Sequence, residues 1–176
     1  MPFDPAATTP GLAEPIDDFD PDPAELLARG VARLLTGLGY ASLTELTLRS
    51  GRRADVAGLD RQGRLLIVEI KRSRADFRAD AKWPDYLDYC DQFYFAVPRG
   101  FPLDVLPDDT GLMLADRYGA EIVRPAAVAR TALHASRRRE VINRFARSAA
   151  TRLTQLHDPQ PETPAAGHRR GLGLGL

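Results

Sequence analysis

Apolar residues recur along the chain at two spacings, and the change of spacing divides the chain into elements. Between residues 24 and 38, leucine and valine return every three or four positions, which is the period of a helix with one buried face. Asp22 and Pro23 precede this run as an N-cap and a first helical residue, and glycines follow it, so a helix is predicted here. A second helical pattern runs from about 126 to 156, and its apolar face is formed by Val141, Ile142, Phe145, Ala149, Leu153 and Leu156.

Between these helices, shorter apolar runs are separated by polar turns and indicate strands. The expected elements are strands at about 43–49, 53–59 and 64–71, a short helix at 84–90, a strand at 92–97, and two small strands at 112–115 and 120–124. The order is therefore helix, three strands, helix, strand, two small strands and a final helix. Such an order predicts an α/β domain built around a mixed sheet that is flanked by helices.

The strand expected at 64–71 has the composition of a strand buried on both faces, yet it ends in charged residues. Glu69 and Lys71 close this stretch. Charged side chains at the end of a buried strand need partners, because burial of an unpaired charge is costly. The apolar side chains that alternate between its two faces are Leu65, Leu66, Ile67, Val68 and Ile70.

The turn before this strand sets its register. A three-residue loop, 61–63, places Gly63 at the left-handed position that such hairpin loops need. With this loop Asp55 lies opposite Glu69 on the neighbouring antiparallel strand, with Cβ atoms about 5 Å apart. Lys71 shares the same face because strand side chains alternate. A slip of one residue would move Asp55 to the other face, so the register decides whether these groups meet.

Two carboxylates this close repel each other, and a divalent cation removes the conflict. Asp55 and Glu69 offer hard oxygen ligands that suit Mg²⁺, and the carbonyl of Ile70, whose side chain points away, can add another. Lys71 can orient or deprotonate a metal-bound water, or neutralise charge that builds on a phosphate. The set predicts metal-assisted phosphodiester hydrolysis with Mg²⁺, for which Mn²⁺ can substitute. The alternative is a surface salt-bridge cluster, which burial of the strand on both faces disfavours.

Further charged residues surround this predicted site. Glu45, ten residues before Asp55, can supply a third carboxylate or can face solvent, and both interpretations stay open. Cations beside a cleavage site hold a nucleic-acid backbone in register. Phosphate contacts are therefore predicted for Arg52, Arg53, Arg72, Arg74, Arg78 and Lys82. The alternative for this set is a solvated loop, in which Asp76 and Asp80 dilute the positive charge.

The aromatic residues and the final helix each allow two interpretations. Trp83, Tyr86 and Tyr89 can stack on bases, but packing against the sheet is favoured, with Tyr86 or Lys82 able to reach the site. The final helix has a basic face that fits either DNA phosphates or solvent. Its arginines are Arg137, Arg138, Arg139, Arg144, Arg147 and Arg152.

Composition narrows the functional classes. The 176 residues include 24 basic and 24 acidic side chains, but six acids and no Lys or Arg lie in residues 1–23, so the remainder is basic and suits a polyanionic partner. Cys90 is the single cysteine, which excludes an internal disulfide and a cysteine-based zinc site. No transmembrane run, secretory signal or glycine-rich nucleotide-binding loop is found, and a cytoplasmic location without membrane association is expected.

Composition also marks the ends of the domain. Residues 1–21 are rich in Pro, Asp and Ala without periodicity, and residues after 156 turn to Pro, Gly and His. The expected organisation is a disordered acidic tail at 1–21, one domain at 22–156 and a flexible tail at 157–176.

Several longer stretches point to one family. An Asp on the second strand and Glu-x-Lys on the third resemble the PD-(D/E)XK nuclease superfamily, although Ala54 stands where Pro often precedes the Asp. The wider sequence, over about residues 24–156, resembles the MmcB-like family of bacterial DNA-repair proteins within that superfamily. The stretches that carry this likeness are RRADVAGLD, IVEIKRSRADFRADAKWPDYLDYCDQFYFAVP, GLMLAD and RRREVINRFARSAATRL.

This resemblance implies a restriction-endonuclease-like core of helix, three antiparallel strands, helix and strand, followed here by a long C-terminal helix. It implies Asp55, Glu69 and Lys71 as the catalytic set of a Mg²⁺-dependent deoxyribonuclease that acts on DNA in repair. The alternative is a nuclease-fold module that binds DNA and recruits other repair proteins without cutting. The sequence does not indicate the oligomeric state.

Overall fold

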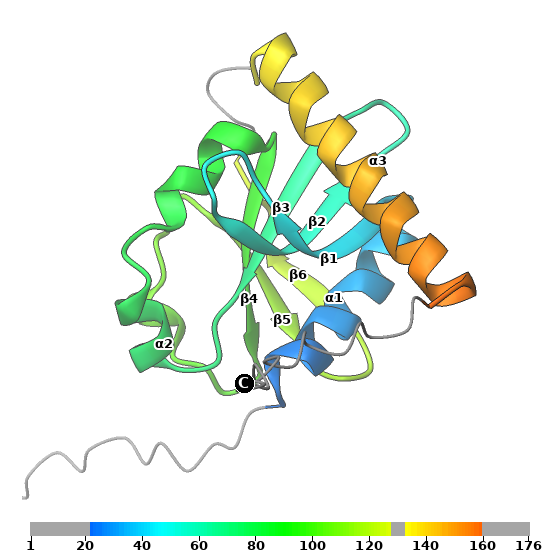
Figure 1. Cartoon of the computed structure of the whole chain (residues 1–176). Helices are drawn as coiled ribbons and strands as arrows, with labels where there is room; N and C mark the ends of the chain where they lie inside the picture. Colours follow the sequence, from blue (N-terminus) through cyan, green and yellow to red (C-terminus); the bar gives the residue numbers. More distant parts are fainter. Residues whose placement is uncertain (1–21, 128–132, 160–176) are drawn as a thin grey trace, which may run out of the picture.

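The computed structural model describes residues 22–127 and 133–159, and it confirms the predicted fold, a mixed sheet flanked by helices with a long helix at the C-terminal end (Figure 1). The elements are α1 (Ala24–Gly37), β1 (Ala41–Thr47), β2 (Arg53–Leu59), β3 (Leu65–Ile70), α2 (Arg74–Ala79), the 3₁₀-helix η1 (Trp83–Tyr89), β4 (Gln92–Pro98), the 3₁₀-helix η2 (Leu103–Val105), β5 (Gly111–Ala115), β6 (Ala120–Arg124) and α3 (Ala135–His157).

The sheet has six strands in the order β1-β2-β3-β4-β5-β6. The first three strands are antiparallel, β3, β4 and β5 run parallel, and β6 returns antiparallel. The turn between β2 and β3 has the expected form, with Gly63 at φ 77°. Val56 pairs with Val68 and Leu59 with Leu65, which is the register that the sequence predicted.

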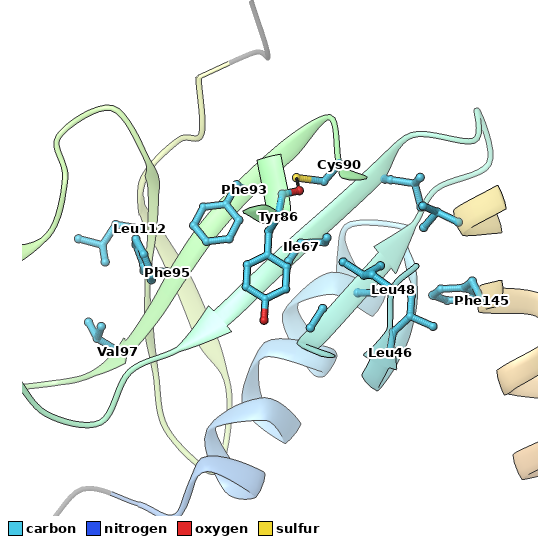
Figure 2. Close-up of a cluster of buried hydrophobic side chains, with 14 of the residues drawn as sticks. Leu46, Leu48, Ile67, Tyr86, Cys90, Phe93, Phe95, Val97, Leu112 and Phe145 are labelled. Carbon is cyan, nitrogen blue, oxygen red and sulfur yellow. Dashed lines mark hydrogen bonds between the residues drawn. The ribbon is translucent and has the colours of Figure 1, made fainter. Parts of the chain in front are cut away.

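Each face of the sheet carries its own hydrophobic cluster. On one face α1 packs Leu27, Val31 and Leu35 against the sheet. On the other face α3 contributes Val141 and Phe145, and η1 and β4 supply an aromatic group (Figure 2). All six residues of β3 are buried, so the prediction of a strand covered on both sides is confirmed.

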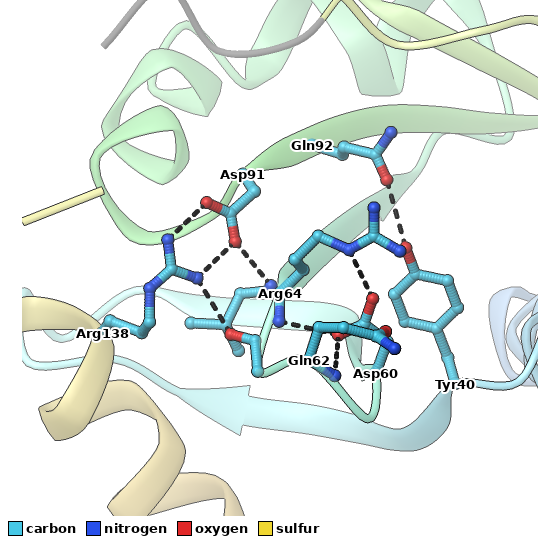
Figure 3. Close-up of polar contacts among 9 residues, drawn as sticks. Tyr40, Asp60, Gln62, Arg64, Asp91, Gln92 and Arg138 are labelled. Atoms are coloured by element: carbon cyan, nitrogen blue, oxygen red, sulfur yellow. Dashed lines mark hydrogen bonds and ion pairs between the residues drawn. The ribbon is translucent and has the colours of Figure 1, made fainter. Parts of the chain in front are cut away.

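Arg138 of α3 forms an ion pair with Asp91, just before β4, and a hydrogen bond with the β2–β3 turn (Figure 3). Arg138 donates to both carboxylate oxygens of Asp91, at 2.6 and 2.7 Å, and its Nη1 also donates to the carbonyl of Gly63 at 2.9 Å. Asp91 in turn accepts a hydrogen bond from the backbone N–H of Leu65 at 2.7 Å. A paired, bidentate arginine of this kind gives geometric specificity as well as stability.

The predicted starts of two helices need correction. Helix α1 begins at Ala24 with Pro23 at the N-cap, and Asp22 does not cap it, because its carboxylate pairs with Arg117 in the β5–β6 turn. Helix α3 begins at Ala135, not at 126, because the side chain of His134 caps it there by accepting from the N–H of Ser136. The alanine-rich stretch before it favours helix by propensity alone.

Helix α2 was not expected, because residues 72–83 show no apolar period. Its start is nevertheless marked by a capping arrangement: Ser73 Oγ accepts from the N–H of Asp76, and Asp76 accepts from the N–H of Arg72. The predicted tail at 1–21 and the tail beyond 159 lie outside the described residues, and α3 includes His157. None of the helices in the described part of the chain combines the length and the hydropathy that a bilayer span requires.

Candidate functional site

Asp55 and Glu69 come together where the pairing of β2 with β3 ends. One step beyond the Val56–Val68 pair, the backbone N–H of Ile70 donates to Asp55 Oδ2 at 2.7 Å, and the N–H of Asp55 donates to Glu69 Oε1 at 3.3 Å. Each carboxylate thus crosses to the other strand and takes up a backbone donor. Two acidic side chains are held side by side by the strands that carry them, which is the juxtaposition that the sequence predicted.

The neighbouring strand β1 is distorted at the same level. Glu45 has φ 55°, and it is the only non-glycine residue with positive φ among the described residues. Leu43 and Leu46 pack into the same cluster although they are three positions apart, an odd spacing that breaks the strict alternation of a strand between them. Arg152 of α3 donates to the carbonyls of Thr44 and Glu45, at 2.6 and 3.1 Å, and so stabilises this distortion.

Lys71 lies beside the two acids, as predicted. Its side chain is 6% exposed, and its Nζ is 3.7 Å from Glu69 Oε2. A second carboxylate lies closer, because Asp80, at the end of α2, places Oδ2 2.6 Å from Nζ. The ammonium is therefore buried between two acidic groups.

Burial makes the pair of acids unfavourable when both are charged. Loss of solvation, with Asp55 beside it, raises the pKa of Glu69 from 4.5 to about 8. Burial likewise raises the pKa of Asp55 above its usual range. Burial alone would lower the pKa of Lys71, but the hydrogen bond that its ammonium donates to Asp80 and the nearby carboxylates outweigh burial and raise that pKa. The acids thus favour a proton or a cation, while the lysine stays charged.

The donor set fits a magnesium ion, which commonly takes one or two protein carboxylates and fills its other positions with water or phosphate oxygens. Asp55 and Glu69 supply two such carboxylates, each with one oxygen engaged by a backbone N–H. Residues 22–127 and 133–159 hold no group of three His, Cys, Asp or Glu side chains that could bind a metal. Glu45 therefore does not join Asp55 and Glu69 as a third carboxylate ligand in this structure. The carboxylate of Glu45 pairs instead with Arg53.

Four of the six predicted phosphate-binding cations are bound to other groups within the described chain. Three of them form ion pairs with acids: Arg52 with Asp85, Arg53 with Glu45, and Arg74 with Asp104. Arg72 donates to the carbonyl of Asp22.

Arg78 and Lys82 are exposed, and within the described chain neither side chain forms a hydrogen bond or an ion pair. These two remain open to an external anion.

The aromatic residues pack in the core, as favoured. Trp83 lies 5.5 Å from the rings of both Phe93 and Phe95, and Tyr86 stacks on Phe93 at 6.1 Å. Figure 2 shows the Tyr86 ring inside the cluster with its hydroxyl at the edge. That hydroxyl donates to the carbonyl of Arg53 at 3.0 Å. Burial raises the pKa of Tyr86, and the nearby carboxylates of Glu69 and Asp55 raise it further. Tyr86 therefore lines the site.

The arginines of α3 are mostly engaged within the protein. Arg137, Arg138 and Arg144 pair with Asp88, Asp91 and Glu140, and Arg152 donates to backbone carbonyls. In the described part of the chain, Arg139 and Arg147 have no such partner, so the basic face is reduced to these two.

Sequence reasoning missed two residues of this site, Asp80 and Arg152. Asp80 follows a helix that has no apolar period, and from the sequence it was considered only as an acid that dilutes the positive charge of this segment. Arg152 is 107 positions from Glu45 in the sequence, and no local sequence pattern indicates that the two residues are in contact.

Comparison with known proteins decides the family. The family model described as DNA repair protein MmcB-like matches residues 13–160. The chain belongs to the MmcB-like DNA repair family. The match includes β2, β3 and the helix that supplies Asp80, so every residue of the site lies within the MmcB-like region. No curated protein sequence matches the chain.

Two solved structures are similar to this MmcB-like chain. A protein of unknown function from Silicibacter pomeroyi is 45% identical, with a TM-score of 0.76, over 83% of this chain and 99% of that one. A repair endonuclease from Pyrococcus abyssi is 22% identical over 38% of this chain and 32% of that one, with a TM-score of 0.28. The first likeness covers nearly the whole relative, whereas the second is too slight to support an argument.

Proposed function

We propose that this member of the MmcB-like family is a Mg²⁺-dependent nuclease of the PD-(D/E)XK type that hydrolyses phosphodiester bonds in DNA during repair. The observation that carries the proposal is the reciprocal arrangement of Asp55 and Glu69, with the buried ammonium of Lys71 3.7 Å from Glu69. Such buried like charges are costly to maintain for stability alone, and they are typical of sites that bind a cation or transfer a proton.

In this proposal Asp55, Glu69 and the carbonyl of Ile70 hold the metal, which would activate a water molecule and stabilise charge on the phosphate. Asp55 and Glu69 are pre-oriented, because each already accepts a backbone hydrogen bond. Lys71 holds a proton and a positive charge beside them, where it can orient the attacking water or offset the charge that develops on the phosphate. Membership of the superfamily, suggested by the sequence, supports the same set.

Access to this site is asymmetric. Glu69 and Lys71 are 3% and 4% exposed, whereas Asp55 is only partly buried and the side chain of Asp80 is 24% exposed. A phosphate group would approach from the side of Asp55 and Asp80, where Arg78 and Lys82 follow on α2 and the loop after it.

A second function rests on this same burial. Because Glu69 and Lys71 are nearly inaccessible, a nuclease-fold module that binds DNA and recruits repair partners is the alternative. Purified protein should be incubated with single-stranded, duplex, flapped and branched DNA in Mg²⁺ or Mn²⁺. Metal-dependent cleavage of any of these supports the nuclease, whereas salt-sensitive binding without turnover on all of them supports the module.

DNA binding should depend on Arg78 and Lys82, the two of the six predicted phosphate-binding cations whose side chains form no hydrogen bond or ion pair in the described part of the chain. We expect Arg78→Ala with Lys82→Ala to weaken binding similarly for all sequences and to reduce the slope of log affinity against log salt by about two, since each phosphate contact contributes about one. Fluorescence anisotropy at several salt concentrations measures this slope.

Arg61→Ala is the matched control, because Arg61 lies in the β2–β3 turn at the opposite end of the hairpin from Asp55. An unchanged slope in the double variant would show that Arg78 and Lys82 do not contact phosphates.

A further inference from the structure

The ammonium of Lys71 has two carboxylates within reach, and it is bonded to only one of them. Its Nζ is 2.6 Å from Asp80 Oδ2 but 3.7 Å from Glu69 Oε2. The first distance is that of a charge-assisted hydrogen bond, and the second is too long for one. Asp80 is therefore the closer, hydrogen-bonded counter-ion of Lys71, and Glu69 forms only a longer ion pair with it.

Asp80 is itself held in place on both sides. Its N–H donates to the carbonyl of Phe77 at 3.2 Å, and its Oδ1 accepts from the N–H of Lys82 at 3.2 Å. Phe77 and Trp83 lie three residues before and after it, and both rings contact Phe95, at 5.4 and 5.5 Å. The contacts of these two rings with Phe95 of β4 thus fix the segment that carries the Asp80 carboxylate.

The two oxygens of Glu69 differ in their availability to a cation. Oε1 of Glu69 accepts from the N–H of Asp55, so Oε2 is the oxygen left for a cation. If Asp80 lost its charge, the nearest remaining acidic oxygen for the buried ammonium would be this Oε2. A shorter, hydrogen-bonded Lys71–Glu69 ion pair would then compete with a divalent cation for the same atom.

We propose that Asp80 is a positioning residue, which holds the Lys71 ammonium away from Glu69 Oε2 and thereby keeps that oxygen available to a divalent cation. The inference rests on the proposed function in one respect, namely that Asp55 and Glu69 bind the cation. It adds a residue outside the Asp and Glu-x-Lys motif, and it gives that residue a role that acts through Lys71.

The test measures Mn²⁺ binding to the full chain without DNA, by electron paramagnetic resonance. Asp80→Asn retains the oxygen that accepts from Lys82 but removes the charge, and we expect it to weaken Mn²⁺ binding by about tenfold, as for other residues that support metal ligands. Asp88→Asn, on the same segment, is the matched control, since Asp88 pairs with Arg137 on the side of α3 and should leave the affinity unchanged.

A double-mutant cycle shows whether Asp80 acts through Lys71. In a Lys71→Met background the competing ammonium is gone, so we expect Asp80→Asn to have no further effect on Mn²⁺ affinity. If the second substitution still weakens binding tenfold, Asp80 is a ligand and not a positioning residue. If Asp80→Asn alone leaves the affinity unchanged, the inference is wrong.

A spectroscopic readout keeps this inference separate from the nuclease proposal. Lys71 and Lys82 are the only lysines in the sequence, so selective ¹⁵N-lysine labelling gives two side-chain ammonium signals to follow by NMR. We expect Asp80→Asn to shift the Lys71 signal and Asp88→Asn to shift neither. An unchanged Lys71 signal overturns the contact, whether or not the protein cleaves DNA or binds Mn²⁺.

The remaining outcomes are also decisive. Protein that binds Mn²⁺ with the expected Asp80 dependence but cleaves no DNA overturns the nuclease and leaves the positioning role standing. Should Asp80→Asn fail to fold, Asp80→Glu retains the charge one methylene further out, and we expect a Mn²⁺ affinity between wild type and a tenfold loss. A wild-type affinity in that variant would contradict a requirement for accurate placement.

Discussion

Replacement of Lys71 with methionine should abolish Mg²⁺-dependent cleavage of DNA, with a loss of at least about 100-fold, the usual contribution of a group that assists proton transfer. Methionine fills nearly the same volume, so the buried position stays packed, but the charge beside Glu69 and Asp80 is lost. Asp55→Asn and Glu69→Gln should be equally inactive, because each removes a charged ligand. Single-turnover cleavage of the preferred DNA, with excess protein, measures the loss.

The matched control for Lys71 is Arg61→Met, an exposed cation in the β2–β3 turn. It should cut at the wild-type rate, and circular dichroism should show that all variants are folded. A well-folded Lys71→Met protein that cleaves DNA as fast as wild type would remove the basis of the site assignment.

Without metal, the protein should lose stability as pH rises from about 4.5 to about 8. Over this range Glu69 stays protonated in the folded state, where its pKa is about 8, but ionises in the unfolded chain, where it is 4.5. The folded state therefore binds more protons, and the free energy of unfolding falls as pH increases. The contribution is complete below pH 4.5 and is lost as pH passes through about 8. Asp55, whose pKa is also raised, acts in the same direction.

Thermal unfolding of wild type and Glu69→Gln at several pH values, with a metal chelator present, measures this effect. We expect the variant to lack this part of the pH dependence and to melt about 5 °C or more above wild type at pH 8, because a neutral side chain is no longer repelled by Asp55. Addition of Mg²⁺ should stabilise wild type at pH 8 and leave the variant nearly unchanged. Parallel pH curves for the two proteins would show that Glu69 is not perturbed as the geometry indicates.

The substitution of Glu69 is expected to affect stability and activity in opposite ways. Glu69→Gln should be more stable than wild type without metal and inactive with it. Such a trade-off is expected where a site keeps like charges buried for chemistry. It also separates the nuclease proposal from a structural role, since a residue that merely holds the fold together would destabilise the protein when it is replaced.

The central hairpin could be predicted from the sequence because its determinants are local. Gly63 fixes the turn, the alternating apolar residues of β3 fix its burial, and the two together place Asp55 beside Glu69. The strand pairing ends one step earlier than expected, since the carboxylates replace the backbone partners there. That detail depends on how two side chains compete for N–H groups, which no periodicity records.

Elements without a hydrophobic period were less predictable. Helix α2 has six residues and one large apolar side chain, Phe77, so only its capping residues distinguished it from a loop. The start of α3 was placed too early because alanine favours helix, whereas the capping side chain of His134 sets the boundary. The contact of Asp80 with Lys71 was not predicted, because it depends on the position of α2 in the folded structure.

The contact between Arg152 and β1 links the last helix to the strand beside the candidate site. The guanidinium holds the carbonyls of Thr44 and Glu45, next to the strand that bears Asp55. Together with Arg138, which binds the carbonyl of Gly63 in the β2–β3 turn, it makes α3 a brace along the sheet from that turn to the end that carries the candidate site. A fragment that stops at β6 would contain every residue of the Asp and Glu-x-Lys motif, yet it would lack these contacts from α3.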